Sequence, residues 1–157
     1  MCVGTDRPDV IFGSKAADEI RAKDALDEVY AKAGNDTLHG GPGKQCDRFG
    51  CWGDLLWGGD GSDDLHGGKD PNELSGMGGD DDLHGGPVHD SLGGFGGNDG
   101  LHGGPAGDRI YEDGGRRDDV DTVRGDAGDD VVHAEDGDGA DTVASNCETV
   151  VEVVPSQ

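Results

Sequence analysis

The sequence is poor in the side chains from which a packed globular core is built. Hydrophobic residues make up 31% of the 157 residues, and aromatic residues only 4%. So little apolar surface, combined with a formal net charge of −23, is typical of disordered chains, because burial does not offset the entropy lost on ordering. A conventional core is therefore not expected, and any fold must draw on another source of stability.

Basic residues and long apolar runs are also scarce. The chain has 12 Lys and Arg against 35 Asp and Glu, whereas nucleic acids and anionic membranes bind through clustered positive charge. We therefore expect neither as a partner, and cations are the natural ligands. No run is long enough for a membrane span, and the N-terminal "MCVGTDRPDV" lacks the basic and apolar regions of a signal peptide.

The sequence does contain 32 glycines and a nine-residue period. Aspartate recurs at every ninth position, interrupted by Gln45 and Asn72, in the series Asp9, Asp18, Asp27, Asp36, Asp54, Asp63, Asp81, Asp90, Asp99 and Asp108. An apolar residue follows two positions later, except at Asp47, in the series Ile11, Ile20, Val29, Leu38, Leu56, Leu65, Leu74, Leu83, Leu92, Leu101 and Ile110. A disordered acidic linker would not be expected to contain an apolar residue at a fixed offset from each aspartate.

Residues 58–66, "GGDGSDDLH", show the repeat in full as G-G-x-G-x-D-x-U-x, where U is apolar. Glycines permit positive φ angles, so backbone carbonyls can converge on one point, and the Asp adds the formal charge that a hard cation requires. The x-U-x triplet is a minimal strand whose middle side chain points inward. Two repeats make one coil of a parallel solenoid, and nonapeptides of this form bind Ca²⁺.

This pattern resembles the RTX family (repeats in toxin, or hemolysin-type calcium-binding repeats) over roughly residues 4–144. The resemblance implies an all-β fold, a right-handed parallel β-roll solenoid of about seven 18-residue coils. Several Ca²⁺ ions would bind between the turns of neighbouring coils. We expect one domain over residues 1–157, in which the apolar stretch "NCETVVEVV" belongs to a C-terminal capping strand within residues 145–157.

The ligands implied by the resemblance are the Asp side chains of both turns and main-chain carbonyls of the first four repeat positions. Transferred by position, with Asn72 as a weaker neutral substitute, the side chains are Asp9, Asp18, Asp27, Asp36, Asp54, Asp63, Asn72, Asp81, Asp90, Asp99, Asp108, Asp121, Asp130 and Asp141. The backbone carbonyls are those of Gly40, Pro42, Gly58, Asp60, Gly76, Gly78, Gly94 and Gly96.

The repeat is interrupted between residues 40 and 57. When residues 44–52 are removed, residues 40–43 join residues 53–57 as an intact repeat, which predicts a loop inserted at a turn. The loop contains Cys46 and Cys51, for which we favour a disulfide and hence an oxidising location. Half of a zinc or redox site is the alternative, although no second CxxC or histidine pair flanks the loop closely.

Two further segments depart from the pattern. Residues 14–32 have alanines in place of glycines and apolar residues at helical spacing, but the period of nine favours coils there, with poorer calcium loops. After Asp108 the register slips and resumes at Asp121 and Asp130, and a further two-residue slip precedes Asp141.

Histidines mark one outer face of the predicted roll. His66, His84 and His102 are eighteen residues apart, and His39 joins the series once the nine-residue loop is subtracted. Four successive rungs, about 4.8 Å apart, would therefore carry His in one file on the solvent side of a sheet. The simplest interpretation is that any polar residue serves there; the alternative is that neighbouring imidazoles bind zinc or nickel.

These features favour a secreted, extracellular, calcium-binding module with a structural or interaction role, whose folding depends on the ion. No G-x-S-x-G, H-E-x-x-H or Walker-type motif is present, so no catalytic role is expected. One alternative is a surface-recognition or adhesion module with an unknown extracellular partner. Another is the non-catalytic repeat region of a secreted hydrolase or toxin. An ice-binding array is disfavoured because the third repeat position carries no Thr or Asn ladder.

Overall fold

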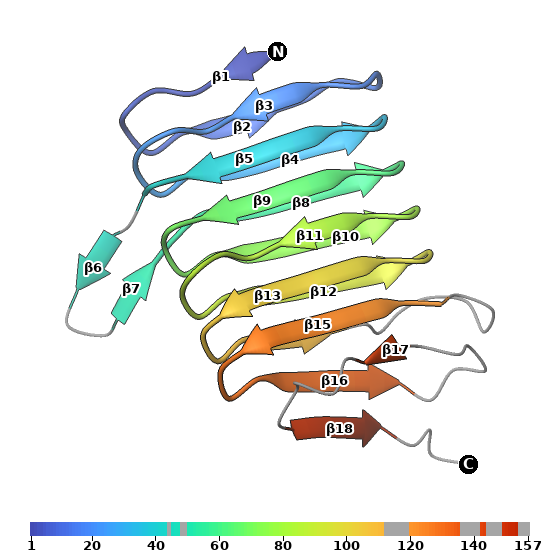
Figure 1. Ribbon diagram of the computed structural model, residues 1–157. Helices are drawn as coiled ribbons and strands as arrows, with labels where there is room; N and C mark the ends of the chain where they lie inside the picture. Colours follow the sequence, from blue (N-terminus) through green and yellow to red (C-terminus); the bar gives the residue numbers. More distant parts are fainter. Residues whose placement is uncertain (44, 48–49, 112–119, 136–141, 144–148, 154–157) are drawn as a thin grey trace.

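The computed structural model describes residues 1–43, 45–47, 50–111, 120–135, 142–143 and 149–153, of which residues 45–47, 50–52, 134–135, 143 and 149–153 are described by their backbone alone. The regular elements in these residues are all strands, and they wind as a solenoid from β1 at one end to β18 at the other (Figure 1). No helix long and apolar enough to cross a membrane occurs in the described part of the chain.

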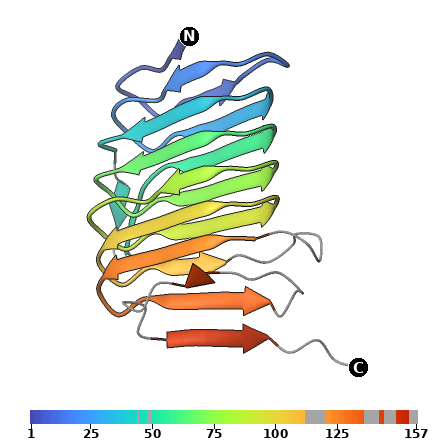
Figure 2. The ribbon, with the colours of Figure 1, turned by 45° about the vertical axis from the view of Figure 1, so that its right-hand side comes forward.

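Two parallel sheets of eight strands each run along the solenoid among the described residues (Figure 2). The sheet that we call the odd sheet contains, in spatial order, β1 (Cys2–Val3), β3 (Glu19–Arg21), β5 (Thr37–Gly41), β9 (Asp64–Gly68), β11 (Asp82–His84), β13 (Gly100–Pro105), β15 (Thr122–Ala127) and β17 (Thr142–Val143). The even sheet contains β2 (Val10–Phe12), β4 (Glu28–Ala33), β8 (Leu55–Asp60), β10 (Glu73–Gly78), β12 (Ser91–Gly96), β14 (Arg109–Tyr111), β16 (Val131–Glu135) and β18 (Thr149–Val153). The fold is therefore the parallel β-roll that the repeat predicts.

The core is a double column of single aliphatic side chains between the sheets. From β3 to β16 the strands of the two sheets bury the U residue of their repeats, whereas Ile11 in β2 is only partly buried. In strands such as β9 and β13 the residues that flank the U residue are more exposed, as strand alternation requires. The odd sheet contributes Ile20, Leu38, Leu65, Leu83, Leu101 and Val123, and the even sheet Val29, Leu56, Leu74, Leu92, Ile110 and Val132, all at most 1% exposed. One such side chain stabilises by about 1.5–3 kcal/mol, whereas ordering just two residues costs about as much. The core alone cannot hold the coils.

The pairing register follows the eighteen-residue coil, with three changes. Leu65 pairs with Leu83, and Leu83 with Leu101. Across residues 44–52 the offset is 27 residues, as in Leu38 with Leu65, because nine residues leave the coil as an antiparallel hairpin of β6 (Gln45–Asp47) and β7 (Gly50–Trp52). The offset is 22 from Leu101 to Val123 and 20 from Val123 to Val143. The last two values agree with the two register slips seen in the sequence.

The turns on the two edges of the roll differ. Turns from the even to the odd sheet form what we call the glycine edge, at residues 13–18, 31–36, 58–63, 76–81 and 94–99. Their fourth position is a glycine with φ between 118° and 137° at Gly34, Gly61, Gly79 and Gly97. Turns from the odd to the even sheet form the proline edge, where the prolines are Pro8, Pro42, Pro71, Pro87 and Pro105. The glycine edge thus carries the more complete repeats.

Residues 14–32 form coils rather than a helix. They contain β3 and the start of β4, with Ile20 and Val29 buried in the core. Tertiary pairing overrides the helical propensity of this segment because each strand has neighbours on its sheet. Ala25 occupies the fourth position of its turn with φ 102°, a conformation that alanine resists, as expected of a weaker turn.

Candidate metal centres along the two edges

The repeat aspartates form one column on each edge of the roll. Within a column, the backbone N–H of each residue donates to the side-chain Oδ1 of the residue one coil further along, at 2.7–2.9 Å. The glycine-edge column contains Asp18, Asp36, Asp63, Asp81, Asp99 and Asp121, and the proline-edge column Asp9, Asp27, Asp54, Asn72, Asp90, Asp108 and Asp130. All except Asp9 and Asp18 are at most 5% exposed.

In eight aspartates of the columns, the second carboxylate oxygen is left without a protein partner. Oδ2 is buried and accepts no hydrogen bond in Asp27, Asp36, Asp54, Asp63, Asp81, Asp90, Asp108 and Asp130. A buried acceptor without a partner costs about 1–3 kcal/mol, and more when it is charged. Two files of such oxygens therefore indicate positively charged partners along both edges.

The first glycine of a repeat provides the space that Oδ2 enters. A Cβ at Gly58 would overlap Oδ2 of Asp63 and would lie 2.9 Å from the carbonyl oxygen of Gly76 in the next coil. At Gly40, on the proline edge, a Cβ would lie 2.5 Å from Oδ2 of Asp54. Side-chain and main-chain oxygens thus converge beside these glycines, and converging oxygens are the ligands that Ca²⁺ prefers.

Burial raises the pKa values of the column carboxyls. It raises the pKa of Asp54 and Asp90 to about 7, that of Asp81 to about 8 and that of Asp108 to about 6. Hydrogen bonds from the neighbouring coil lower these pKa values, and nearby carboxylates raise them, but burial dominates. The pKa is also raised, mainly by burial, in Asp27, Asp36 and Asp63. Full ionisation of the columns therefore needs a cation nearby.

The first two aspartates differ from the rest. Oδ2 of Asp9 accepts a hydrogen bond from Oγ1 of Thr5 at 2.9 Å, and Oδ2 of Asp18 accepts one from the backbone N–H of Ser14 at 2.7 Å. The hydrogen bonds from Ser14 hold the pKa of Asp18 below its usual value. Both carboxylates are thus satisfied within their own turns, and they lack the unsatisfied oxygen found further along.

The side-chain oxygen and nitrogen of Asn72 also have hydrogen-bond partners within the protein. Its Oδ1 accepts from the backbone N–H of Asp54 at 2.8 Å, as an aspartate would. Its Nδ2, which replaces the second carboxylate oxygen, donates to the carbonyl oxygen of Asp70. Asn72 therefore preserves the hydrogen-bonded column without adding a negative charge or an unsatisfied acceptor.

The predicted carbonyl ligands lie in the turns and at the strand ends beside the columns. On the glycine edge, each of three third-position carbonyls accepts a hydrogen bond at 2.6–2.9 Å from the fourth-position N–H of the preceding coil. The N–H groups of Gly34, Gly61 and Gly79 donate to the carbonyls of Asp60, Gly78 and Gly96, respectively. Each of these carbonyls keeps a second lone pair for a ligand. Strands β8, β10 and β12 contain Gly58, Gly76 and Gly94, respectively. The carbonyl oxygen of Gly40 accepts a hydrogen bond from the N–H of Lys23 at 3.0 Å, and Pro42 directly follows β5. Asp141 lies outside the described residues.

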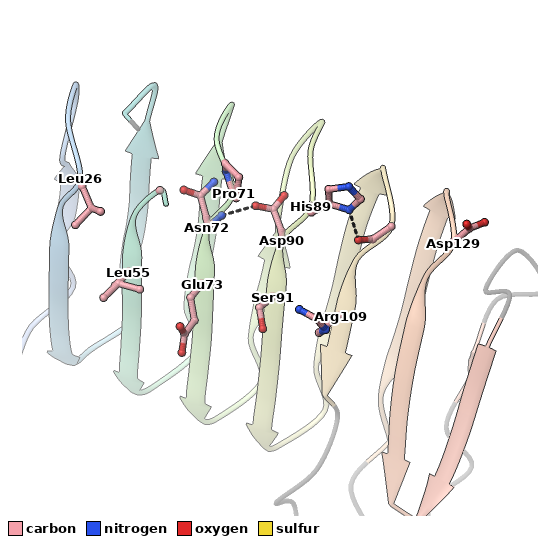
Figure 3. Close-up of a pocket in the computed structure, with 12 residues that line it drawn as sticks. Leu26, Leu55, Pro71, Asn72, Glu73, His89, Asp90, Ser91, Arg109 and Asp129 are labelled. Carbon is pink, nitrogen blue, oxygen red and sulfur yellow. Dashed lines mark hydrogen bonds between the residues drawn. The ribbon is translucent and has the colours of Figure 1, made fainter. Parts of the chain in front are cut away.

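A groove of about 740 Å³ follows the proline edge (Figure 3). It contains Asn72, whose N–H donates to Oδ1 of Asp90, and His89, whose Nδ1 lies 2.5 Å from the carbonyl oxygen of Gly107. Its other walls come from the variable fifth and seventh repeat positions, including Leu26, Pro71, Asp129, Leu55, Glu73 and Arg109. The repeat could not indicate this groove, because those positions have no fixed residue type.

The outer sheet faces carry stacked rings. His39, His66, His84 and His102 lie on the odd sheet with centroids 5.0, 5.0 and 4.8 Å apart and ring planes within 12°. Burial, followed by the adjacent imidazole, lowers the pKa values of His39 and His102. On the even sheet, Tyr30 stacks on Trp57 at 4.5 Å. The period of the repeat explains both the stacked histidines and the Tyr30–Trp57 stack, because residues one coil apart lie on neighbouring strands.

The two loop cysteines lie opposite each other. In the hairpin, Cys46 and Cys51 are directly paired across the antiparallel strands β6 and β7. Their side chains lie outside the described residues, so the disulfide stays a prediction. Cys2, in β1, is a free cysteine.

Comparison with protein families identifies the repeat. Four copies of the RTX calcium-binding nonapeptide repeat match the chain, at residues 3–38, 23–44, 57–92 and 114–144. The chain belongs to this family. Comparison with curated proteins gives no match.

The described residues of this RTX chain fit the ion that the family binds. The unsatisfied Oδ2 atoms and the neighbouring carbonyls form an all-oxygen donor set with high negative charge, which suits Ca²⁺. A bound ion would supply positive charge to the buried carboxylates, and the chain's own role is to bring oxygens from adjacent coils together. RTX repeats arranged in a β-solenoid thus fit a calcium-binding β-roll module.

Proposed function

We propose that this chain is an exported, non-catalytic module that folds when it meets extracellular Ca²⁺ and then serves as a rigid structural or interaction element. The observation that carries the proposal is the pair of aspartate columns, in which buried Oδ2 atoms have no protein partner. Without a cation, the carboxylates of a column would either be protonated or repel one another across adjacent coils. Binding of a cation is therefore favourable.

Calcium concentration explains why such a module would fold after export. Extracellular calcium modules commonly bind with Kd of about 10⁻⁴–10⁻³ M, far above cytosolic calcium levels. The chain would therefore remain unfolded during synthesis and fold outside the cell. The family supports export in general terms, since RTX repeat proteins are typically secreted.

The experiment is isothermal titration of Ca²⁺ into the full chain at pH 7.5, with Mg²⁺ in a parallel titration. We expect several Ca²⁺ ions to bind and Mg²⁺ to bind much more weakly, because Mg²⁺ requires a smaller octahedral site. A chain that binds no Ca²⁺, or that binds Mg²⁺ equally well, would contradict the proposal.

A pair of variants tests whether Ca²⁺ binds at the aspartate columns. Asp81→Asn keeps the Oδ1 that accepts from Asp63 but removes the charge at the buried Oδ2. We expect the affinity of the sites it serves to fall about tenfold or more, since ligand charge sets calcium affinity. Glu73→Gln, an equal charge change at an exposed residue of β10, is the control and should leave the titration unchanged. Equal effects of the two substitutions would show that only net charge matters.

A further inference from the structure

A second group of metal-ligating side chains lies on the outer face of the odd sheet, away from both edges. In β9 and β11 the residues immediately before and after the buried leucine point to this face. The register pairs Asp64 with Asp82 and His66 with His84, and it pairs His84 with His102. A short file of carboxylates therefore runs beside the file of histidines.

The two files are in contact. His66 Nε2 lies 2.8 Å from Asp64 Oδ1, His84 Nε2 lies 3.3 Å from Asp82 Oδ1, and His102 Nε2 lies 3.8 Å from the same Asp82 oxygen. Asp64 Oδ1 is enclosed and yet accepts no hydrogen bond. Its partner is His66 Nε2 at 2.8 Å, a contact that a bound metal ion would replace.

The ligand atoms form two overlapping sets. In each set, one carboxylate oxygen and two imidazole nitrogens lie within 4.8 Å of one another: Asp64, His66 and His84 in the first, and Asp82, His84 and His102 in the second. Zinc–nitrogen bonds of about 2.0–2.1 Å require tetrahedral ligand atoms about 3.3 Å apart. Side-chain rotation can bring the ligand atoms that much closer while the backbone stays in register.

We propose that this face binds one divalent transition-metal ion, such as Zn²⁺, through His84 together with either Asp64 and His66 or Asp82 and His102. Both sets need His84, so the two positions exclude each other. Two nitrogens and one oxygen suit Zn²⁺ and leave a fourth position for water, whereas Ca²⁺ prefers oxygen ligands alone. The site is chemically separate from the calcium columns.

His39 distinguishes a metal site from a general effect of the histidine file. Its ring stacks on His66 at 5.0 Å, as the ring of His84 does. The residue at the carboxylate position of its strand is Thr37, which pairs with Asp64. His39 belongs to neither ligand set and provides a matched control.

The experiment is isothermal titration of Zn²⁺ into the full chain in saturating Ca²⁺, with cysteine thiols alkylated so that they cannot bind the ion. We expect one Zn²⁺ per chain, at least a tenfold loss of affinity in His84→Ala, and unchanged affinity in His39→Ala. Asp82→Asn removes one ligand set only, so binding should persist through Asp64 and His66. Circular dichroism of each calcium-loaded variant verifies that the roll is intact.

Absence of Zn²⁺ binding in the unmodified chain would overturn the proposal, as would equal losses in His39→Ala and His84→Ala. Absorption of bound Co²⁺ provides an independent measurement. Its visible bands should disappear in His84→Ala and remain in His39→Ala. Bands that persist without His84 would place the ion elsewhere and would also overturn the proposal.

Discussion

Each buried aspartate of the columns has two roles, one for each carboxylate oxygen. Oδ1 accepts an N–H from the adjacent coil and so joins the coils of the folded roll, as Asp81 does for Asp63. Oδ2 of Asp81, like that of the other seven aspartates named above, has no protein partner and is available to the ion. Asn72 separates the two roles, because it keeps the first and replaces the second with an amide that donates to Asp70.

At the residue scale, glycine is predicted to be essential at the first position of the repeat and expendable at the third. Gly58→Ala would place a Cβ against Oδ2 of Asp63, so we expect destabilisation of the calcium-bound roll by about 1–3 kcal/mol and weaker calcium binding. Gly78→Ala is the control, because its nearest contact would be 3.8 Å away and its φ is not positive. Thermal unfolding in Ca²⁺ measures both. Equal stability of the two variants would contradict this account of the cradle.

Sequence reasoning succeeded for residues whose position in the repeat determines their surroundings. The U residues lie in the core because period nine and strand alternation together point the same repeat position inward in successive strands. The hydrogen bonds from N–H to Oδ1 were not predicted, because they join residues of different coils and depend on the register. Asp64 and Asp82 were also missed beside the histidines, although their position two residues earlier on the same exposed face was a usable signal.

At the element scale, the unit of the fold is a turn followed by a short strand, and the extra residues that the structure describes lie between the strands of the two sheets. The hairpin of β6 and β7 leaves the coil at the proline edge, while the strands on either side of it stay in register with their neighbours. This segment was recognisable in the sequence because its removal restores an intact repeat. The groove along the same edge was not, because it depends on side chains at variable positions.

Deletion of residues 44–52, which joins Gly43 directly to Gly53, should therefore leave the roll intact. The pairs Leu38 with Leu65 and Val29 with Leu56 would be kept, now at the ordinary spacing of one coil. We expect the deleted chain to bind the same number of Ca²⁺ ions and to show the same circular dichroism spectrum in Ca²⁺. Loss of the β-signal on deletion would mean that the hairpin supports the coils, contrary to this account.

At the scale of the whole molecule, negative charge opposes folding as strongly as the core favours it. Two ionised carboxylates about 4.8 Å apart, at the spacing of adjacent coils, repel by on the order of 3 kcal/mol at an effective dielectric constant of about 20. One fully buried aliphatic side chain contributes about 1.5–3 kcal/mol. With a net charge of −23, the balance is decided by whatever neutralises the columns, either calcium or protons.

Protons should therefore partly replace calcium. Burial raises the pKa of Asp54 and Asp90 to about 7 and that of Asp81 to about 8, from 3.8. Raised carboxyl pKa values stabilise the metal-free roll fully below about pH 4, and this contribution is lost as the pH rises through about 7–8. The lowered pKa values of His39 and His102 act in the opposite direction, but these are two partly exposed rings.

The measurement is circular dichroism of the chelated protein between pH 8 and pH 5. We expect the β-signal to increase as the pH falls. Calcium affinity, measured by titration over the same range, should decrease because each ion must displace protons. A β-signal that falls on acidification, or a calcium affinity independent of pH, would show that the column carboxyls are not the groups that titrate.

The central claim, that calcium holds the two aspartate columns together and thereby folds the roll, is tested most directly by far-ultraviolet circular dichroism of the full chain at pH 8. One sample contains excess chelator and the other excess Ca²⁺, with Mg²⁺ at the same concentration as the ionic-strength control. The account predicts a disordered spectrum in chelator and in Mg²⁺, and a β-sheet spectrum that appears on addition of Ca²⁺. An unchanged β-sheet spectrum in chelator would contradict it.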